Sequence, residues 1–382
     1  MMKYRVPFVI ATASIWLISC SRSPEQQVEV FEPEYHIKNH VYVDSIKSED
    51  LIENFEYISL ETRDDCLVGK VDDLQIVDDK LYIVSDDRVL VFDFDGKLIF
   101  KIDQIGRGPA EYQRIDNISI DDGTLFLYDN TQYGVLGFDA STGGYLFTKK
   151  LEYSVRQAIV RDGLVYSDRG GIGNPYISND DRLLIGRFGE PEKIRSFFSQ
   201  SKTVVQSNCY MDVYDGEMYW IDPLLNKVFK VDGDGVRSYL FYDFGTDNAT
   251  ADLPKDAPLS QLSKRNMKFN IANICETGDY VFSTMISGSE MVYMRFDKDQ
   301  QVNYVYKNIS KPFYQTLPIA ETVYENRSYK VVPSWLVMFM KYNMAEKGFQ
   351  LDADHRDYGI YKAVLERTDS DNPLIARFDL KR

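Results

Sequence analysis

Three stretches of this sequence repeat one order of short strands and turns. They are DDLQIVDDKLYIVSDDRVLVFDFDGKLIFKI (residues 72–102), DNISIDDGTLFLYDNTQYGVLGFDASTGGYLFTKKL (116–151) and MDVYDGEMYWIDPLLNKVFKVDGDGVRSYLFYDF (211–244). Each has four apolar-alternating runs with an Asp/Gly-rich turn before the last, a pattern typical of antiparallel strands joined by tight turns. Because one such unit cannot bury its apolar surface alone, its recurrence predicts the blades of a β-propeller.

Weaker copies of the unit lie at about 157–198 and 273–309, and the final copy is irregular. In that copy, YKVVP (329–333) and NPLIARFDL (372–380) predict strands, and SWLVMFMKYNMAEKG and HRDYGIYKAVLERT between them predict helices. The sequence therefore predicts an all-β fold: a six-bladed β-propeller of four-stranded antiparallel blades, with helical insertions near the C-terminus. We expect FEYISLE (55–61) and NPLIARFDL to share a blade, because that pairing closes the ring and hides two strand edges.

The composition supports a large packed body and excludes one class of partner. Hydrophobic residues make up 44% of the chain and aromatic residues 14%, which favours strands over disorder. The formal net charge is −15, and a surface this acidic repels phosphate backbones. We therefore expect no nucleic-acid partner.

The first 20 residues, MMKYRVPFVIATASIWLISC, predict export. Their apolar run is well short of the ~20 residues that a membrane-spanning helix needs, so it predicts a signal peptide over residues 1–19. The segment Leu17-Ile18-Ser19-Cys20 resembles the lipobox of bacterial lipoproteins. That resemblance implies an acyl anchor, a palmitate-type modification, on Cys20 that holds the protein to a membrane. The alternative is an ordinary signal peptide with a chance cysteine.

The segment after Cys20 is polar and irregular, and we interpret residues 20–52 as the lipidated cysteine and a tether, followed by the propeller over residues 53–382. The remaining cysteines, Cys66, Cys209 and Cys275, are odd in number and have no CxxC spacing. They exclude a disulfide framework and a cysteine-rich zinc site. The sequence leaves open whether two of them pair, and we expect small buried thiols.

A family resemblance rests on two motifs. Residues 105–147 resemble an NHL-type repeat, and the body resembles the six-bladed β-propeller lipoproteins of diderm bacteria, which share a GxGPxEY turn between blades and a final strand led by Asn-Pro. Here these motifs are GRGPAEY (106–112) and Asn372-Pro373, although one interblade connection alone keeps the full turn motif. The resemblance implies a body anchored in the cell envelope, at the outer membrane.

The GRGPAEY turn supplies the candidate ligand-binding residues. It precedes the innermost strand of a blade, so it should lie on the face where propellers bind ligands, and Arg107, Glu111 and Tyr112 could contact a ligand there. Asp129 ends a second strand and should open on the same rim. The alternative is structural: glycines with positive φ, Pro109 fixing the turn and Tyr112 packing between blades.

Other motifs have a plainer interpretation. Asp93-Phe94-Asp95-Gly96 and Asp232-Gly233-Asp234-Gly235 contain fragments of calcium loops, but neither continues to a bidentate Glu, so we expect hairpin turns. Tyr219, Trp220 and Trp335 could stack on sugars, but aromatic residues in a sheet protein more often pack in the core, which is our expectation for them.

Enzymatic chemistry has little support in the sequence. The histidines are His36, His40 and His355, which leaves no His-rich metal centre and scant material for a Ser/His/Asp triad. We expect no metal and no cofactor. The predicted function is an envelope-anchored binding or scaffolding propeller, with a monomeric body, for a glycan, peptide or protein partner. The alternative is a hydrolase or lyase acting on a polysaccharide or small ester. A glycosidase needs a pair of carboxylates, and the spacing of acids in the sequence does not show which two would pair.

Overall fold

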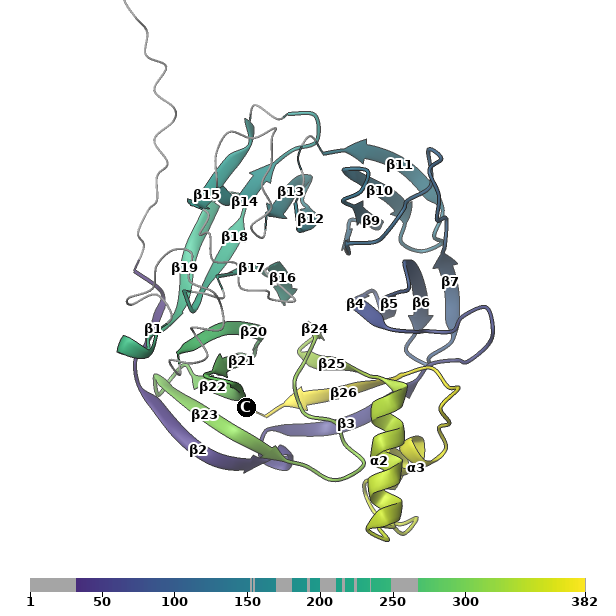
Figure 1. Cartoon of the computed structure of the whole chain (residues 1–382), viewed down its shortest axis with the longest axis vertical. Helices are drawn as coiled ribbons and strands as arrows, with labels where there is room; N and C mark the ends of the chain where they lie inside the picture. The colour runs from purple at the N-terminus through teal and green to yellow at the C-terminus, as the bar shows by residue number, and fades with distance from the viewer. Residues whose placement is uncertain are drawn as a thin grey trace, which may run out of the picture.

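The described strands form six sheets arranged as a ring around a central opening (Figure 1). The computed structural model describes residues 32–381, apart from residues 152, 154, 170–180, 191–192, 200–210, 215–216, 223–224, 234 and 249–266. Neighbouring strands within each blade are antiparallel through its four-stranded core. The predicted six-bladed β-propeller is therefore confirmed.

Five blades take four consecutive strands each, and the first strand of each lies innermost (Figure 1). Blade 1 is β4 (Val71–Val77), β5 (Lys80–Ser85), β6 (Arg88–Asp93) and β7 (Leu98–Ile102); blade 2 is β8 (Asn117–Asp121), β9 (Thr124–Asp129), β10 (Gly134–Asp139) and β11 (Tyr145–Lys150). Blade 3 is β12 (Gln157–Arg161), β13 (Leu164–Asp168), β14 (Asp181–Gly186) and β15 (Arg195–Ser199). Blade 4 is β16 (Met211–Tyr214), β17 (Glu217–Asp222), β18 (Lys227–Asp232) and β19 (Gly235–Tyr242); blade 5 is β20 (Lys268–Glu276), β21 (Tyr280–Ser287), β22 (Glu290–Asp297) and β23 (Val302–Ser310).

The Asp-rich turns are hairpins, as predicted. Asp93 Oδ1 accepts a hydrogen bond from the Lys97 amide at 2.8 Å, and Gly96 has a φ of 78°, a left-handed conformation that glycine adopts without a steric penalty. Asp232 Oδ1 accepts the Gly235 amide at 3.0 Å in the matching turn of blade 4. Both aspartates therefore serve turn geometry between the third and fourth strands of a blade.

Blade 6 combines the two ends of the folded body. It consists of β24 (Thr322–Tyr324), β25 (Arg327–Val332), β26 (Leu374–Leu380) and β3 (Ile52–Ser59), and β3 pairs antiparallel with β26 (Figure 1). The expected closure of the ring by these two segments is confirmed. The predicted helices are α2 (Ser334–Glu346) and α3 (Tyr358–Leu365), inserted between β25 and β26.

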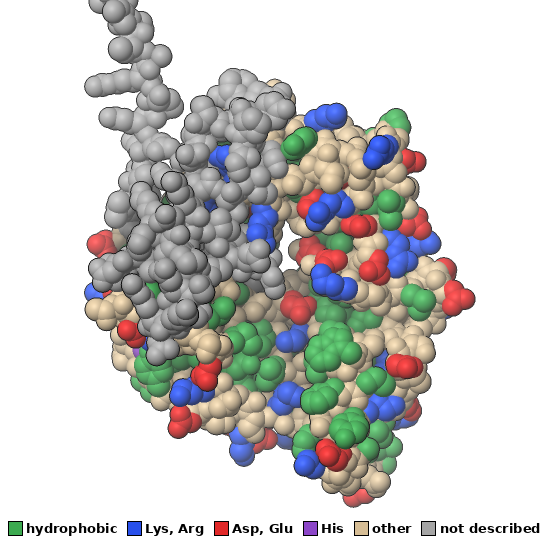
Figure 2. Space-filling model, in the orientation of Figure 1, with side chains coloured by type: hydrophobic (Ala, Val, Ile, Leu, Met, Phe, Trp, Pro, Cys, Tyr) green, Lys and Arg blue, Asp and Glu red, His purple; other side chains and the backbone are tan. Residues whose placement is uncertain are grey.

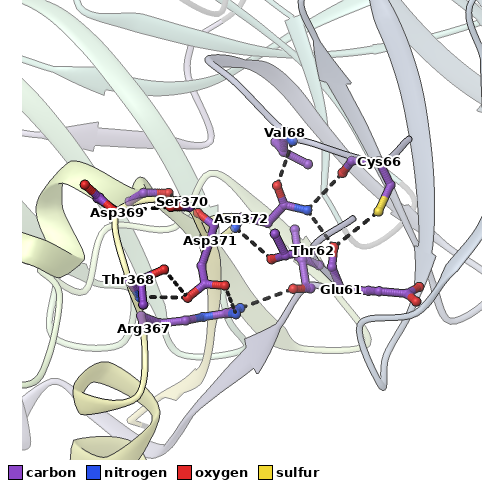
Figure 3. Close-up of polar contacts among 12 residues, drawn as sticks. Glu61, Thr62, Cys66, Val68, Arg367, Thr368, Asp369, Ser370, Asp371 and Asn372 are labelled. Atoms are coloured by element: carbon purple, nitrogen blue, oxygen red, sulfur yellow. Dashed lines mark hydrogen bonds and ion pairs between the residues drawn. The ribbon is translucent and has the colours of Figure 1, made fainter. Parts of the chain in front are cut away.

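A buried asparagine fastens this closure (Figure 3). Asn372, 3% exposed, precedes β26, and its Nδ2 donates to the carbonyl oxygens of Glu61 at 2.6 Å and Cys66 at 2.9 Å. Its Oδ1 accepts the Val68 amide at 2.7 Å, and its own amide donates to Thr62 Oγ1 at 3.0 Å. One side chain thus holds the loop that leads from β3 into blade 1.

The tether prediction was wrong in its boundary. Within the expected tether of residues 20–52, β1 (Tyr35–Ile37) and β2 (His40–Lys47) are strands that add in parallel to β19 and β23 as fifth strands of blades 4 and 5. A blade edge offers unpaired backbone groups, so a polar segment can join it without an apolar alternation of its own. Short 3₁₀ turns cover Ser48–Asp50 and Gly245–Asp247. The described propeller body therefore includes β1 and β2, and it does not begin at residue 53.

The described core consists of six hydrophobic clusters, each between two neighbouring blades. Tyr82 and Val91 of blade 1, for example, pack with Leu127 of blade 2 in one of them. The cluster between blades 5 and 6 also takes Val337, Met340 and other residues from α2 and α3. Stability is consequently spread around the ring, as expected where each blade buries its faces against its neighbours.

The described cysteines are buried thiols. Cys66 and Cys275 are free, and burial raises the pKa of the Cys275 thiol to about 12. Cys209, Cys20 and the predicted signal peptide lie outside the described residues. No helix in the described part of the chain is both long and apolar enough to cross a membrane.

Candidate functional site at the mouth of the central channel

A channel of about 2010 Å³ runs through the centre of the ring. The innermost strands β4, β8, β12 and β16 line it, together with β24 and the start of α2. Figure 2 shows this hollow with Lys, Arg, Asp and Glu side chains around it, and hydrophobic side chains gathered over α2 on the same face. A concave site with a few convergent polar groups is the usual form of a ligand site.

We call the end of the channel at which the innermost strands begin the upper mouth. Lys70, Arg114 and Arg156 lie there, each just before an innermost strand. Lys70 pairs with Asp72, and Arg114 Nη2 lies 3.0 Å from Asp116 Oδ1. Cationic and anionic groups therefore alternate around this rim, although the whole chain is strongly acidic.

Several polar side chains of the channel wall form hydrogen bonds to the backbone of the neighbouring blade. Asn117 Nδ2 donates to the Ala158 carbonyl at 2.6 Å, and its Oδ1 accepts the Ala158 amide at 3.0 Å, which joins β8 to β12. Gln157 makes the same two bonds to the backbone of Met211, at 2.8 and 3.0 Å, and joins β12 to β16. These amides hold adjacent blades in register and have little capacity left for a ligand.

Two carboxyl groups in the wall have perturbed acidity. Asp73, on β4, accepts Gln75 Nε2 at 3.2 Å, and burial raises its pKa to about 6. Glu321, before β24, faces the channel, and its Oε2 accepts the Val331 amide at 3.1 Å. Burial raises the pKa of Glu321, and the negative charge of Asp73 raises it further. The structure thus places two carboxyl groups that lie far apart in the sequence in the wall of one channel. Sequence spacing could not predict this.

Two half-buried lysines accompany these acids. Lys330, on β25, lines the channel and makes no hydrogen bond or ion pair with any described residue. Burial lowers its pKa, while Glu321 nearby opposes that shift. Lys311 donates to the Gln315 carbonyl at 2.5 Å, and burial and the positive charge of Lys330 lower the pKa of Lys311.

An exposed aromatic side chain stands at the upper mouth. Trp335, at the start of α2, lines the channel and is 71% exposed. Phe339 and Tyr342 follow it on the exposed side of the helix, at 57% and 63%. The expectation that aromatic residues are core holds for Tyr219 and Trp220, which are 2% and 0% exposed, and is wrong for Trp335.

The GRGPAEY turn has a tight internal structure. Glu111 Oε2 accepts the Gly108 amide at 2.7 Å, and a Cβ on Gly106 would lie 2.0 Å from this carboxylate oxygen. Gly106 and Gly108 are not among the glycines with positive φ, so close approach by Glu111 explains these glycines, and the expected left-handed backbone does not. Tyr112 is fully buried between blades 1 and 2, and its hydroxyl donates to the Ile102 carbonyl at 3.1 Å.

Asp129 lies beside this turn, as predicted. Its Oδ2 accepts the Gln113 amide at 2.7 Å and its Oδ1 accepts the Thr131 amide at 2.8 Å, with no exposed surface. Arg107 is exposed and has no hydrogen bond or ion pair to the described residues. The predicted residues are therefore brought together on one rim, but none of Arg107, Glu111, Tyr112 and Asp129 lines the channel.

Sequence reasoning missed Asp73, Glu321 and Lys330, and it assigned Trp335 to the core. No local signal in the sequence marks Asp73 or Glu321 as a site residue. Trp335 did carry a signal, because it lies in a helix with apolar residues on nearly every side, and such a helix cannot bury all of them. No group of three or more His, Cys, Asp or Glu residues in the described part of the chain could hold a metal ion.

The family described as "Domain of unknown function (DUF4934)" matches residues 29–378. The chain belongs to this family. The matched range begins before β1, which agrees with the inclusion of β1 and β2 in the folded body. No curated protein matches the sequence.

Solved structures share the fold. A protein of Bacteroides fragilis, described as inferred to be exported, is 16% identical and has a TM-score of 0.71, and the match covers 91% of this chain and 100% of that one. The extracellular domain of a proposed one-component system of Bacteroides thetaiotaomicron is 13% identical with a TM-score of 0.38, covering 73% of this chain and 31% of that one. At these identities, the first likeness shows the propeller fold alone and the second supports no argument.

Proposed function

We propose that this protein is an envelope-anchored binding protein that holds a glycan at the upper mouth of its channel. The observation that carries the proposal is Trp335, whose ring is 71% exposed beside the charged rim of a concave channel. A sugar ring has an apolar face and a polar edge. An exposed indole can cover the face, while the carboxyl and cationic groups of the mouth bind the hydroxyls.

The position in the envelope rests on separate support. The lipobox-like Leu17-Ile18-Ser19-Cys20 segment implies an acyl anchor, and the B. fragilis protein that shares the fold is itself inferred to be exported. A peptide or a protein is the other partner that the sequence allows. The concave channel with its charged rim favours a glycan, because protein partners usually bind across a broad surface of about 800 Å² per side.

A glycan array probed with the purified full chain tests this proposal. We expect binding to a subset of glycans, and Trp335→Ala should reduce it about tenfold or more while Trp335→Phe retains most of it. Tyr42→Ala is the matched control, because Tyr42 is also an exposed aromatic residue, at 58%, but lies on the outer strand β2. Equal losses for Trp335→Ala and Tyr42→Ala, or no binding to any glycan, would exclude the proposal.

Hydrolysis of the bound glycan is a second candidate function. Asp73 and Glu321 both have raised pKa values in the channel wall, and many glycosidases use a pair of carboxyl groups in which the acid has a raised pKa. New reducing ends, released from a glycan that binds in the array, would establish it. In that case Asp73→Asn and Glu321→Gln should abolish release, and an intact glycan after prolonged incubation would leave binding alone.

A further inference from the structure

Lys330 is a cation of the channel wall that has no hydrogen-bond or ion-pair partner among the described residues. Its ammonium is half-buried and lines the channel, whereas Lys70 and Arg114 at the rim each pair with an aspartate. The described residues offer Lys330 no hydrogen-bond acceptor and no carboxylate within ion-pair distance. A charge removed from bulk water without a partner is costly, so this position favours an anion that the chain itself does not supply.

The neighbours of Lys330 strengthen this requirement. The positive charge of Lys330 acts on Lys311, and Lys311 has only a backbone carbonyl, that of Gln315, as its acceptor. The acid that faces Lys330 is Glu321, whose Oε2 is already bonded to the Val331 amide and which Asp73 repels. The carboxylate that acts on Lys330 is therefore itself partly occupied by a backbone hydrogen bond.

We propose that the glycan at the upper mouth carries an oxyanion, either a carboxylate or a sulfate ester, and that Lys330 pairs with it inside the channel. This inference rests on the proposed glycan binding and adds the class of sugar. An ammonium group is a compact cation that accepts either anion, so the chemistry of Lys330 does not distinguish them. The arginines at the rim, Arg114 and Arg156, line the same channel and add donors for oxyanions farther along a charged chain.

The overall charge of the protein disfavours general binding of polyanions. With a net charge of −15, the chain has no general attraction for polyanions, and its long-range field opposes their approach. Binding of a polyanion must therefore come from a local site. Because Lys330 is half-buried, its interaction with an oxyanion is screened less by salt than an ion pair on the exposed surface would be.

Calorimetric titration of the full chain with three polymers tests the inference. Polygalacturonate carries carboxylates, dextran sulfate carries sulfate esters, and dextran is neutral. We expect at least one charged polymer to bind about tenfold or more tightly than dextran, and the polymer that does so identifies the anion. Lys330→Gln should abolish this preference with little change for dextran, and Lys330→Arg should keep it, because a guanidinium group retains the positive charge.

Lys347→Gln is the control, since Lys347 is an exposed lysine just after α2 and outside the channel, and it should keep the preference. The inference is overturned if dextran binds as well as both charged polymers, or if Lys330→Gln keeps the preference. In either case, array binding that depends on Trp335 would leave the proposed function standing. If no glycan binds at all, both the inference and the proposed function fail.

Discussion

The side-chain oxygen of Asn372 accepts the backbone amide of Val68 at 2.7 Å, although the two residues lie 304 positions apart. This bond joins the residue that leads into β26 to the loop that leads into β4, so it spans the point where the ring closes (Figure 3). A turn residue of blade 1 makes a related bond, because Asp87 Oδ1 accepts the Ile115 amide at 3.0 Å. Polar side chains between the second and third strands thus hold the connection to the next blade.

Replacing Asn372 should weaken the closure. Asn372→Ala leaves two carbonyls and one amide, all buried or part-buried, without their side-chain partner, and we expect a loss of roughly 2–4 kcal/mol in the free energy of unfolding. Urea denaturation of the full chain measures it. Asn308→Ala is the control, because Asn308 is exposed, and it should change stability by less than about 0.5 kcal/mol. Similar stabilities for the two variants would contradict this role.

The GRGPAEY turn should separate into structural and exposed residues. Tyr112→Ala removes a fully buried ring between blades 1 and 2 and should cost about 3–5 kcal/mol. Tyr112→Phe loses only the hydroxyl bond to Ile102 and should cost about 1 kcal/mol. Arg107→Ala should be neutral within about 0.5 kcal/mol.

The melting temperatures of the Tyr112→Ala, Tyr112→Phe and Arg107→Ala proteins measure the order of their stabilities. A drop of several degrees for Arg107→Ala would show that the arginine supports the fold, and would remove it from the candidate ligand residues. Loss of glycan binding by a stable Arg107→Ala protein would instead place a ligand on this rim, in addition to the channel.

Asp73 should make the protein less stable as pH rises from about 4 to 6. Burial raises its pKa in the folded protein to about 6, above the value of about 3.9 in an unfolded chain. Between these values the folded state binds more protons than the unfolded state, so stability falls as pH rises and stays low above pH 6. Asp73→Asn should remove this dependence and be more stable than the wild type at pH 7 by about 1–2 kcal/mol.

Denaturation across pH 3–8 measures this effect, with Asp72→Asn as the control. Asp72 is the neighbouring residue but is exposed and paired with Lys70, so its variant should keep the wild-type dependence. A destabilised Asp73→Asn protein at pH 7 would show that the charged carboxylate of Asp73 is stabilising, contrary to the raised pKa.

The anchor on Cys20 stays a prediction from the lipobox-like segment. Growth with a fatty-acid analogue should label the wild-type protein, and Cys20→Ala should remove the label because the acylated thiol is gone. Cys66→Ala is the control: Cys66 is a buried thiol and should not affect labelling. Equal labelling of wild type and Cys20→Ala would exclude Cys20 as the acylated residue.

The blades could be predicted from the sequence because their signals are local. Alternating apolar residues and Asp-Gly turns recur within each unit, and a strand needs only its neighbours in the chain to show which face is buried. The spare segments at the two ends, FEYISLE and NPLIARFDL, also followed from the need to close a ring. In the structure they are β3 and β26, paired from Leu374 opposite Ser59 to Leu380 opposite Ile52.

The tertiary structure alone decided the site, since its residues meet only when the ring closes. Asp73 belongs to blade 1, whereas Glu321 and Lys330 belong to blade 6, so no spacing in the sequence relates them. The exposure of Trp335 depends on which face of α2 packs on the body, and a helix with apolar residues on nearly every side does not specify that face. The strands β1 and β2 likewise exist because the finished blades 4 and 5 offer open edges, and backbone hydrogen bonds at an edge need no particular side chains.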